Sequence, residues 1–331
     1  MPNRFASVLL ASLLCTAPAA ALAQSQPAPP AKPAGSTAVA PITVEAAPKP
    51  KVIQQQSHAF VEKYAAVPNV EVDQIGRWRD PVCVQVEGLV KAQASLVKAR
   101  VEEVAKALGL PAARPYCDAN VEVVFTDKPQ ATMDAVAKRR EQLLGYYHRH
   151  DHDKLKTVTR PIQAWYVTAT KGGGGDIAGY IFNAHAGATA TPIAQTHDEV
   201  IDDPDNQPPA SCGINHNFTE CLQSVFKNVF VVVDAKRLEG QDLGLITDYI
   251  VMVALSQPRS LDGCNAMSSV IDLLAPSGCS GRQPPDGLTP ADAAYLTALY
   301  SADLEAKKVG EQGEIAGRMA KILTRAANGG R

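Results

Sequence analysis

The chain has 331 residues, of which 46% are hydrophobic, with 32 Lys and Arg against 34 Asp and Glu. This composition supports a substantial hydrophobic core and excludes wholesale disorder and a fibrous fold. The formal net charge of -2 gives no electrostatic reason to expect nucleic acid or an anionic membrane surface as a partner. The length fits one large domain or two smaller ones.

Residues 1–23 have the three parts of a cleaved export signal. Arg4 forms a short basic region, residues 8–15 are apolar, and residues 21–23 supply the small side chains that signal peptidase accepts before Gln24. The apolar stretch is too short to cross a bilayer, and no later segment is long and apolar enough to do so. We therefore expect a mature chain that begins at Gln24, has no transmembrane segment and is periplasmic or secreted.

The cysteines agree with export. Removal of the signal takes Cys15 away and leaves six of the seven cysteines, an even number that predicts disulfides in an exported chain. A lipoprotein modified at Cys15 is the alternative, although Leu14 stands where a lipobox has a small residue. No pair has the close spacing of a zinc site. The six mature cysteines are Cys83, Cys117, Cys212, Cys221, Cys264 and Cys279.

Composition divides the mature chain into a tail and a body. Residues 24–56 are rich in Pro, Ala and Lys and cannot bury much apolar surface, so we expect a disordered linker there. A cell-wall spacer or a ligand for a partner is the alternative for this linker. Residues 57–331 are expected to form a single α/β domain. We expect residues 184–226 to form a loop insertion in it, because they lack clear periodicity.

The body opens with a β-α-β unit. The alternation in 82–86 predicts a strand, the helical spacing in 90–108 predicts a helix that Gly109 ends, and 121–125 predicts a second strand. A helical crossover makes the two strands parallel neighbours, so they begin at the same edge of the sheet. Cys83 opens the first strand and Cys117 precedes the second, which favours a disulfide between them.

Further elements predict a mixed sheet with packed helices. The most apolar run, 228–234, is expected at the centre of the sheet. Short separations favour the pairs Cys212–Cys221 and Cys264–Cys279. The other predicted elements, in chain order, are a helix at 132–147, a strand at 162–167, a turn at 172–175, a strand at 179–182, and helices at 243–257, 289–300 and 312–327.

Few residues suggest metal chemistry. His148, His150 and His152 would share one face of a strand and could hold a metal, but the run follows a helix and precedes lysines, which favours a solvated helix end. Residues 197–205 are acidic and lack the glycine-bearing calcium loop. Residues 172–176 are not a phosphate loop, because no Gly-Lys-Ser/Thr follows them.

The last third of the chain has a strand at 229–234, an apolar helix at 243–257, and the stretch Gly-Leu-Thr-Pro-Ala-Asp-Ala-Ala-Tyr-Leu-Thr-Ala-Leu-Tyr at 287–300. In these elements it resembles the zincin-type metallopeptidase fold, in particular uncharacterised exported bacterial proteins of that type. The β-α-β opening is similar to the start of that fold. The resemblance touches most of residues 80–302 and implies a zincin-like fold.

The chain departs from this family at its active helix. A zincin uses His-Glu-x-x-His, in which two imidazoles one turn apart hold zinc and the glutamate activates water. The helix at 243–257 offers Asp248, Tyr249 and Met252 at the degenerate positions, with neither histidine nor glutamate. We expect these side chains to serve the core, with no catalytic residue and no cofactor.

These observations lead to two hypotheses about function. The first is a non-catalytic binding or scaffold protein with another periplasmic or envelope protein as its partner, which would bind at the loop of residues 184–224. The second is a metal-dependent hydrolase with a non-standard site. Its ligands would come from His148, His150, His152, His185 and His197.

Overall fold

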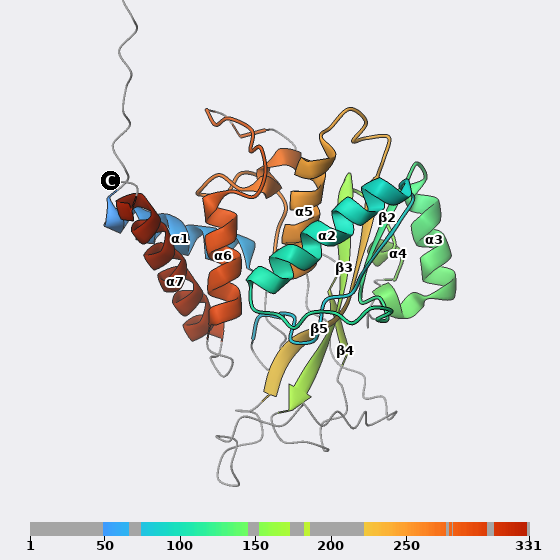
Figure 1. Ribbon diagram of the computed structural model, residues 1–331, viewed down its shortest axis with the longest axis horizontal. Coiled ribbons are helices and arrows are strands. Elements are labelled where there is room, and N and C mark those ends of the chain that lie inside the picture. Colours follow the sequence, from blue (N-terminus) through green and yellow to red (C-terminus); the bar gives the residue numbers. More distant parts are fainter. Residues whose placement is uncertain are drawn as a thin grey trace, which may run out of the picture. The chain divides into compact units, whose positions relative to one another are not determined.

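The computed structural model describes residues 49–65, 74–144, 152–172, 182–185, 222–275, 278–279, 281–302 and 308–329, all within the compact unit Ala47–Arg331. Its five strands form one mixed sheet in the order β1-β2-β5-β3-β4 (Figure 1). β1 (Val84–Glu87), β2 (Val121–Thr126) and β5 (Leu222–Asp234) run parallel to one another. β3 (Ile162–Gly172) runs antiparallel to both β5 and β4 (Phe182–His185). The predicted mixed α/β sheet, with the most apolar strand at its centre, is confirmed.

The β-α-β opening forms as the sequence predicts. α2 (Lys91–Ala107) connects β1 to its parallel neighbour β2, and Val84 lies opposite Val121. α2 packs on the sheet through Val97, Val101 and Ala105, whose spacing of three to four residues places them on one face of the helix. This crossover brings the beginnings of β1 and β2 to the same edge.

Both faces of the sheet are covered, which explains the continuous apolar run in β5. Val229, Val231 and Val233 belong to the main core, whereas Phe230 and Val232 belong to a smaller cluster on the opposite face. Side chains alternate between the two faces of a strand, so a strand with a core on each side has no polar face.

Helices from the two ends of the chain cover the main core. α1 (Pro50–Tyr64) packs along α7 (Lys308–Gly329), which in turn packs against α6 (Pro290–Ser301) (Figure 1). α5 (Leu243–Leu255) begins at an N-cap aspartate, Asp242, and every residue from Ile246 to its end is buried. The predicted closing helices of the body are therefore present.

A smaller cluster lies under α3 (Pro129–Arg139), a 3-10 turn η1 (Glu141–Leu144) and the short α4 (His152–Leu155). The predicted helix at 132–147 is wrong in its extent. The α-helix begins earlier and ends at Arg139, after which a 3-10 turn buries Leu143 and Leu144. The remaining members of this cluster are Met133, Trp165, Phe230 and Val232.

Three other predicted boundaries require correction. The linker expected at 24–56 ends earlier, because α1 begins at Pro50 and buries Ile53 within the expected linker. The loop insertion expected at 184–226 overlaps β4, which ends at His185, and β5, which begins at Leu222. Gly172 was expected to open a turn but is the last residue of β3.

A buried ion pair holds α7 to the rest of the core. The guanidinium of Arg77 and the carboxylate of Glu311 form a salt bridge in which the two side chains are 3% and 0% exposed. Glu311 also accepts a hydrogen bond of 2.8 Å from the backbone N–H of Ile75, and Arg77 donates one of 2.6 Å to the carbonyl of Leu299 on α6. The backbone of Arg77 pairs with β5, so α6, α7 and the sheet meet at this side chain.

Candidate functional site

The helix that resembles the zinc helix of a zincin is α5. Asp248, Tyr249 and Met252 lie in its central turns and are 8%, 1% and 0% exposed. Tyr249 and Met252 belong to the main hydrophobic core, and burial raises the pKa of Tyr249 above its ordinary value. These two side chains pack as core residues.

Both carboxylate oxygens of Asp248 already have protein partners. Oδ1 accepts a hydrogen bond of 2.8 Å from Nε of Arg100 on α2, and Oδ2 accepts one of 2.9 Å from the backbone N–H of Leu288. The hydrogen bond to Asp248 raises the pKa of Arg100, with burial opposing it. Asp248 therefore connects α5 to α2 and to the segment that leads into α6.

A small hollow of about 440 Å³ lies beside this ion pair, between α2 and the start of α5. Asp242 and Asp286 line it together with Arg100 and Asp248. Asp242 is engaged as the N-cap of α5, where its side chain accepts a hydrogen bond from Leu245. Asp248 and Asp242 thus serve helix packing and capping.

The described structure does not bring the histidines of the second hypothesis together. His148, His150 and His197 lie outside the described residues. His152 is the first residue of α4, and β4 places His185 opposite Tyr166. Among the residues that the structure describes, no three His, Cys, Asp or Glu side chains form a group that could hold a metal ion.

Two of the three predicted disulfides are confirmed. Cys83 pairs with Cys117 and Cys264 pairs with Cys279. The predicted pair Cys212–Cys221 lies outside the described residues, as does most of the loop in which partner binding was expected. The first disulfide closes the edge where β1 and β2 begin, and the second closes the segment before α6.

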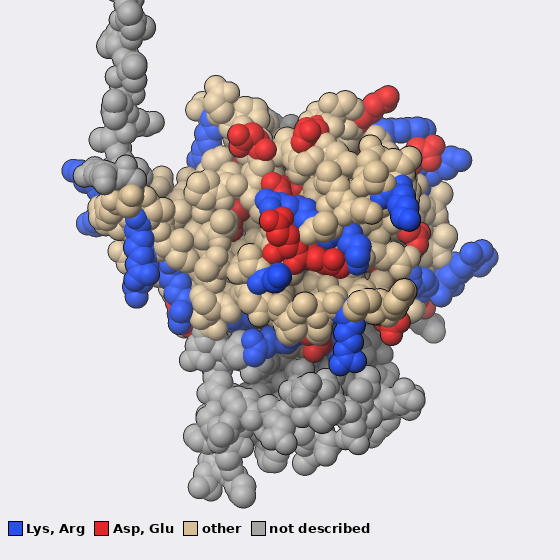
Figure 2. Space-filling view, viewed as in Figure 1, with Lys and Arg blue, Asp and Glu red and all other residues tan. Residues whose placement is uncertain are grey.

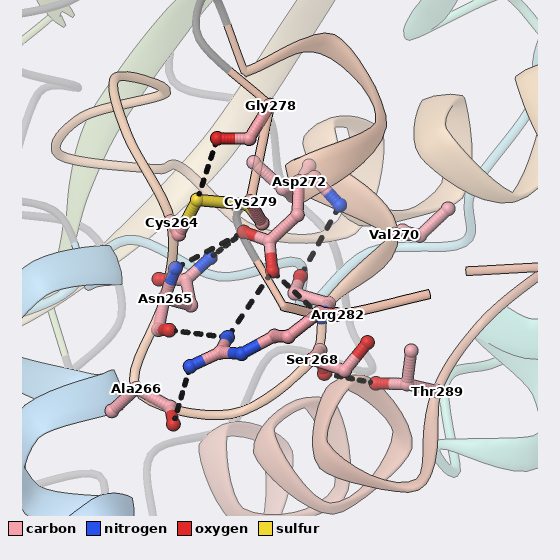
Figure 3. A network of polar contacts seen from close by, with 12 residues as sticks. Cys264, Asn265, Ala266, Ser268, Val270, Asp272, Gly278, Cys279, Arg282 and Thr289 are labelled. Carbon is pink, nitrogen blue, oxygen red and sulfur yellow. Dashed lines mark hydrogen bonds and ion pairs between the residues drawn. A yellow bond between two sulfur atoms is a disulfide. The ribbon is translucent and has the colours of Figure 1, made fainter. Parts of the chain in front are cut away.

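The second disulfide borders a polar network around the 3-10 turn η4 (Val270–Leu274), drawn in Figure 3. The carboxylate of Asp272 accepts hydrogen bonds of 3.1 Å from the backbone and side-chain nitrogens of Asn265. Arg282 donates to the carbonyls of Asn265 and Ala266 and lies 3.7 Å from the Asp272 carboxylate. These contacts hold residues 265–266 and Arg282 against η4.

A buried carboxylate continues this network into α6. Asp292 accepts a hydrogen bond of 2.6 Å from the Ser269 hydroxyl, and it forms a capping box with Thr289 at the start of α6. Burial raises the pKa of Asp292 above its ordinary value, while the hydrogen bonds that it accepts oppose that increase. The Leu-Thr-Pro-Ala-Asp stretch that carries the family resemblance is thus a helix start joined to a second capped turn.

A groove of about 900 Å³ lies between α2, β1 and the segment that connects α2 to β2. We call it the β1 groove. Its floor is apolar and includes Val82, Val84 and Ala105, which are buried. Residues 111–117, which contain two prolines and end at the disulfide, form one wall, and α2 forms the other.

Basic side chains without an acidic partner line this groove. Lys91, Lys106 and Arg114 are exposed, and the structure gives them no ion pair among the described residues. The two glutamates of the lining are engaged, because Glu102 pairs with Lys98 and Glu103 pairs with Arg100. Figure 2 shows this face, where acidic and basic side chains touch at the centre and further basic side chains, with a few acidic ones, follow the lower margin.

Tyr116, in the outer wall of the β1 groove, combines two unusual properties. Its backbone has φ of 66°, and its side chain is 105% exposed, which is full exposure. A bulky residue with a positive φ is uncommon and strained. Sequence reasoning missed Tyr116 and Arg114. The two prolines that flank Arg114 were the signal that this connection has a defined shape.

Comparison of the chain with models of known families, with characterised proteins and with solved structures finds no match. The zincin-like identity therefore stays a prediction. None of the described helices is both long and apolar enough to cross a membrane. The two disulfides indicate an oxidising, extracytoplasmic environment.

Proposed function

We propose that this chain is a non-catalytic binding protein of the periplasm, exported through residues 1–23, whose zincin-like helix has become part of the core. The observation that carries this proposal is the environment of Asp248. A catalytic zinc site needs imidazole or carboxylate atoms that are free to bind the metal and leave a position open for water. Both oxygens of Asp248 instead accept hydrogen bonds from Arg100 and Leu288.

The positive charge of Arg100 also disfavours the binding of a metal ion at Asp248. Its Nε lies 2.8 Å from Oδ1 of Asp248, so the guanidinium already neutralises the charge that a bound cation would need. A zinc ion there would displace the guanidinium or be repelled by it. Asp248 is therefore suited to joining helices rather than to binding a metal.

Other features of the chain support the periplasmic location and the binding function. The two disulfides support the periplasmic assignment, because such bonds persist in oxidising compartments. The β1 groove supports a binding function, since it is concave, has an apolar floor and is lined by unpaired charges. We assign the partner to the proteins of the cell envelope.

The experiment uses the full chain purified from the periplasm. Bound metal is measured after dialysis, and hydrolysis of fluorescent casein is measured with and without added zinc. We expect no stoichiometric zinc and no hydrolysis above that of a buffer control. Stoichiometric zinc together with hydrolysis, both lost in the triple variant H148A/H150A/H152A, would establish the histidine-based hydrolase instead.

A further inference from the structure

We propose that the β1 groove binds an extended acidic peptide segment of the partner protein, held by ionic contacts to its rim and by the ring of Tyr116. This inference rests on the proposed binding function and names its partner chemistry. It depends on three features of the groove: its unpaired cations, its capped edge strand and its strained, exposed tyrosine.

The charge of the groove selects an anionic occupant. Lys91, Lys106 and Arg114 face it without acidic partners, and its glutamates are engaged by Lys98 and Arg100. The groove thus carries an uncompensated positive charge on a chain whose formal net charge is -2. A local excess of charge opposite to that of the whole chain attracts and orients a partner of complementary charge.

The edge strand determines how a peptide is held. β1 has β2 as its only neighbour in the described sheet. The carbonyl of Cys83 faces β2, where it accepts from the N–H of Val121, so the next carbonyl along the strand, that of Val84, faces away from β2. Lys98 caps this outer carbonyl with a hydrogen bond of 3.0 Å. A lysine over an exposed edge opposes strand addition, so side-chain contacts must hold the peptide.

Tyr116 provides the apolar contact. Its backbone is in the strained left-handed region, yet its ring stands fully in solvent and contributes nothing to the core. The disulfide at the next residue, Cys117, fixes the position from which the ring projects. A rigidly mounted tyrosine at the rim of a groove is the kind of side chain that dominates binding energy at protein interfaces.

The shape of the site favours a peptide over other anions. The groove is concave, and its floor is formed by the valines of β1 and by Ala105. A membrane surface cannot enter a concave groove to reach this floor. A polypeptide that alternates acidic and apolar side chains can place its carboxylates on the rim cations and its apolar side chains on the floor.

Fluorescence polarisation tests the proposal with short labelled peptides that alternate Glu and Val, and with Lys–Val peptides as the matched control. We expect the Glu–Val peptide to bind in a salt-sensitive manner and the Lys–Val peptide not to bind. The variant K106E/R114E should weaken binding by about tenfold or more. The matched control K321E/R325E reverses two exposed charges on α7, outside the groove, and should leave binding unchanged.

Two variants separate the ring of Tyr116 from its backbone. Tyr116→Gly removes the ring and relieves the positive φ, so it should lower affinity without lowering stability. Tyr116→Phe should retain most of the affinity. An affinity of Tyr116→Gly for the Glu–Val peptide equal to that of the wild type would overturn the proposed site. Equal affinities of K106E/R114E and K321E/R325E for this peptide would overturn it as well.

Mass spectrometry of the same samples distinguishes a failure of this inference from a failure of the proposed non-catalytic function. Cleaved peptides would contradict the non-catalytic function. Intact peptides that fail to bind would contradict the acidic-peptide groove alone. Binding is also measured to vesicles of phosphatidylcholine and phosphatidylglycerol. Binding to these vesicles but not to the peptide, if it is lost in K106E/R114E, would also overturn the inference.

Discussion

Oδ1 of Asp248 on α5 lies 2.8 Å from Nε of Arg100 on α2, and this contact joins two helices that are far apart in the sequence. The side chain of Asp248 is 12% exposed, whereas that of Arg100 is 36% exposed. Asp248 also accepts a hydrogen bond from the N–H of Leu288, so its carboxylate joins α5, α2 and the segment that leads into α6.

Asp248→Ala should destabilise the protein by about 1–3 kcal/mol, because it removes a charge-assisted hydrogen bond and leaves the Leu288 N–H without its acceptor. Arg100→Ala should cost less, since its side chain is more exposed and the Leu288 contact survives. Urea denaturation of both single variants and the double variant measures the coupling. Loss of binding by folded Asp248→Ala would contradict a purely structural role.

Gly287→Ala tests the packing around the same carboxylate. A Cβ at Gly287 would lie 2.8 Å from Oδ2 of Asp248, so the carboxylate would have to move, at a cost of about 1–3 kcal/mol. Gly317→Ala is the matched control, because this glycine lies inside α7 with open space around it. That control should stabilise the protein by about 0.5–1 kcal/mol. Thermal unfolding of the two variants should shift in opposite directions.

Sequence periodicity predicts the helices and strands that bury one face. It predicts the contacts between these elements less well. The β-α-β opening followed from alternation in β1 and helical spacing in α2. The partnership of Asp248 with Arg100 could not be predicted, since it depends on where α2 crosses α5. α1 shows a different failure: Ile53, Phe60 and Tyr64 have helical spacing, but the composition before them favoured a linker.

The two described disulfides should differ modestly in their effect on stability. In the chain-entropy model, the Cys83–Cys117 bond spans 34 residues and contributes about 3–4 kcal/mol, while Cys264–Cys279 spans 15 and contributes about 3 kcal/mol. Paired Cys→Ala variants, compared by chemical denaturation, measure both effects. A larger loss from C264A/C279A would show that the polar network of Figure 3 depends on its disulfide.

Glu311→Ala should destabilise the protein by about 3–5 kcal/mol, because it leaves the buried guanidinium of Arg77 without its counter-charge. Glu314→Ala is the control on the same helix. Glu314 pairs with Arg318 at the surface, so its loss should cost less than about 1 kcal/mol. Hydrogen exchange in α7 should accelerate in the first variant only. Equal protection of the α7 amides from hydrogen exchange in the two variants would contradict the role of Arg77 in anchoring this helix.

The raised pKa of Asp292 predicts a specific pH dependence. The unfolded chain releases this proton near the ordinary value of 3.8, whereas the folded chain retains it to a higher pH. The contribution of Asp292 to stability is therefore complete below about 3.8 and declines as pH rises through the folded-state pKa. Unfolding free energies of wild type and Asp292→Asn, measured across this range, should give a difference that falls with pH and then levels off. A difference that rises with pH would contradict the assigned shift.

The packing of α1 against α7 has a consequence for the order in which the chain can assemble. Arg77 is synthesised well before Glu311 and the helix that carries it, because Glu311 lies 234 positions later in the chain. Until then, the nascent chain would have to bury Arg77 without a counter-charge, which is strongly unfavourable. α1 likewise lacks α7, the helix along which it packs. The domain therefore completes its fold only after α7 has been synthesised, and a nascent chain without α7 remains open on this side of the core.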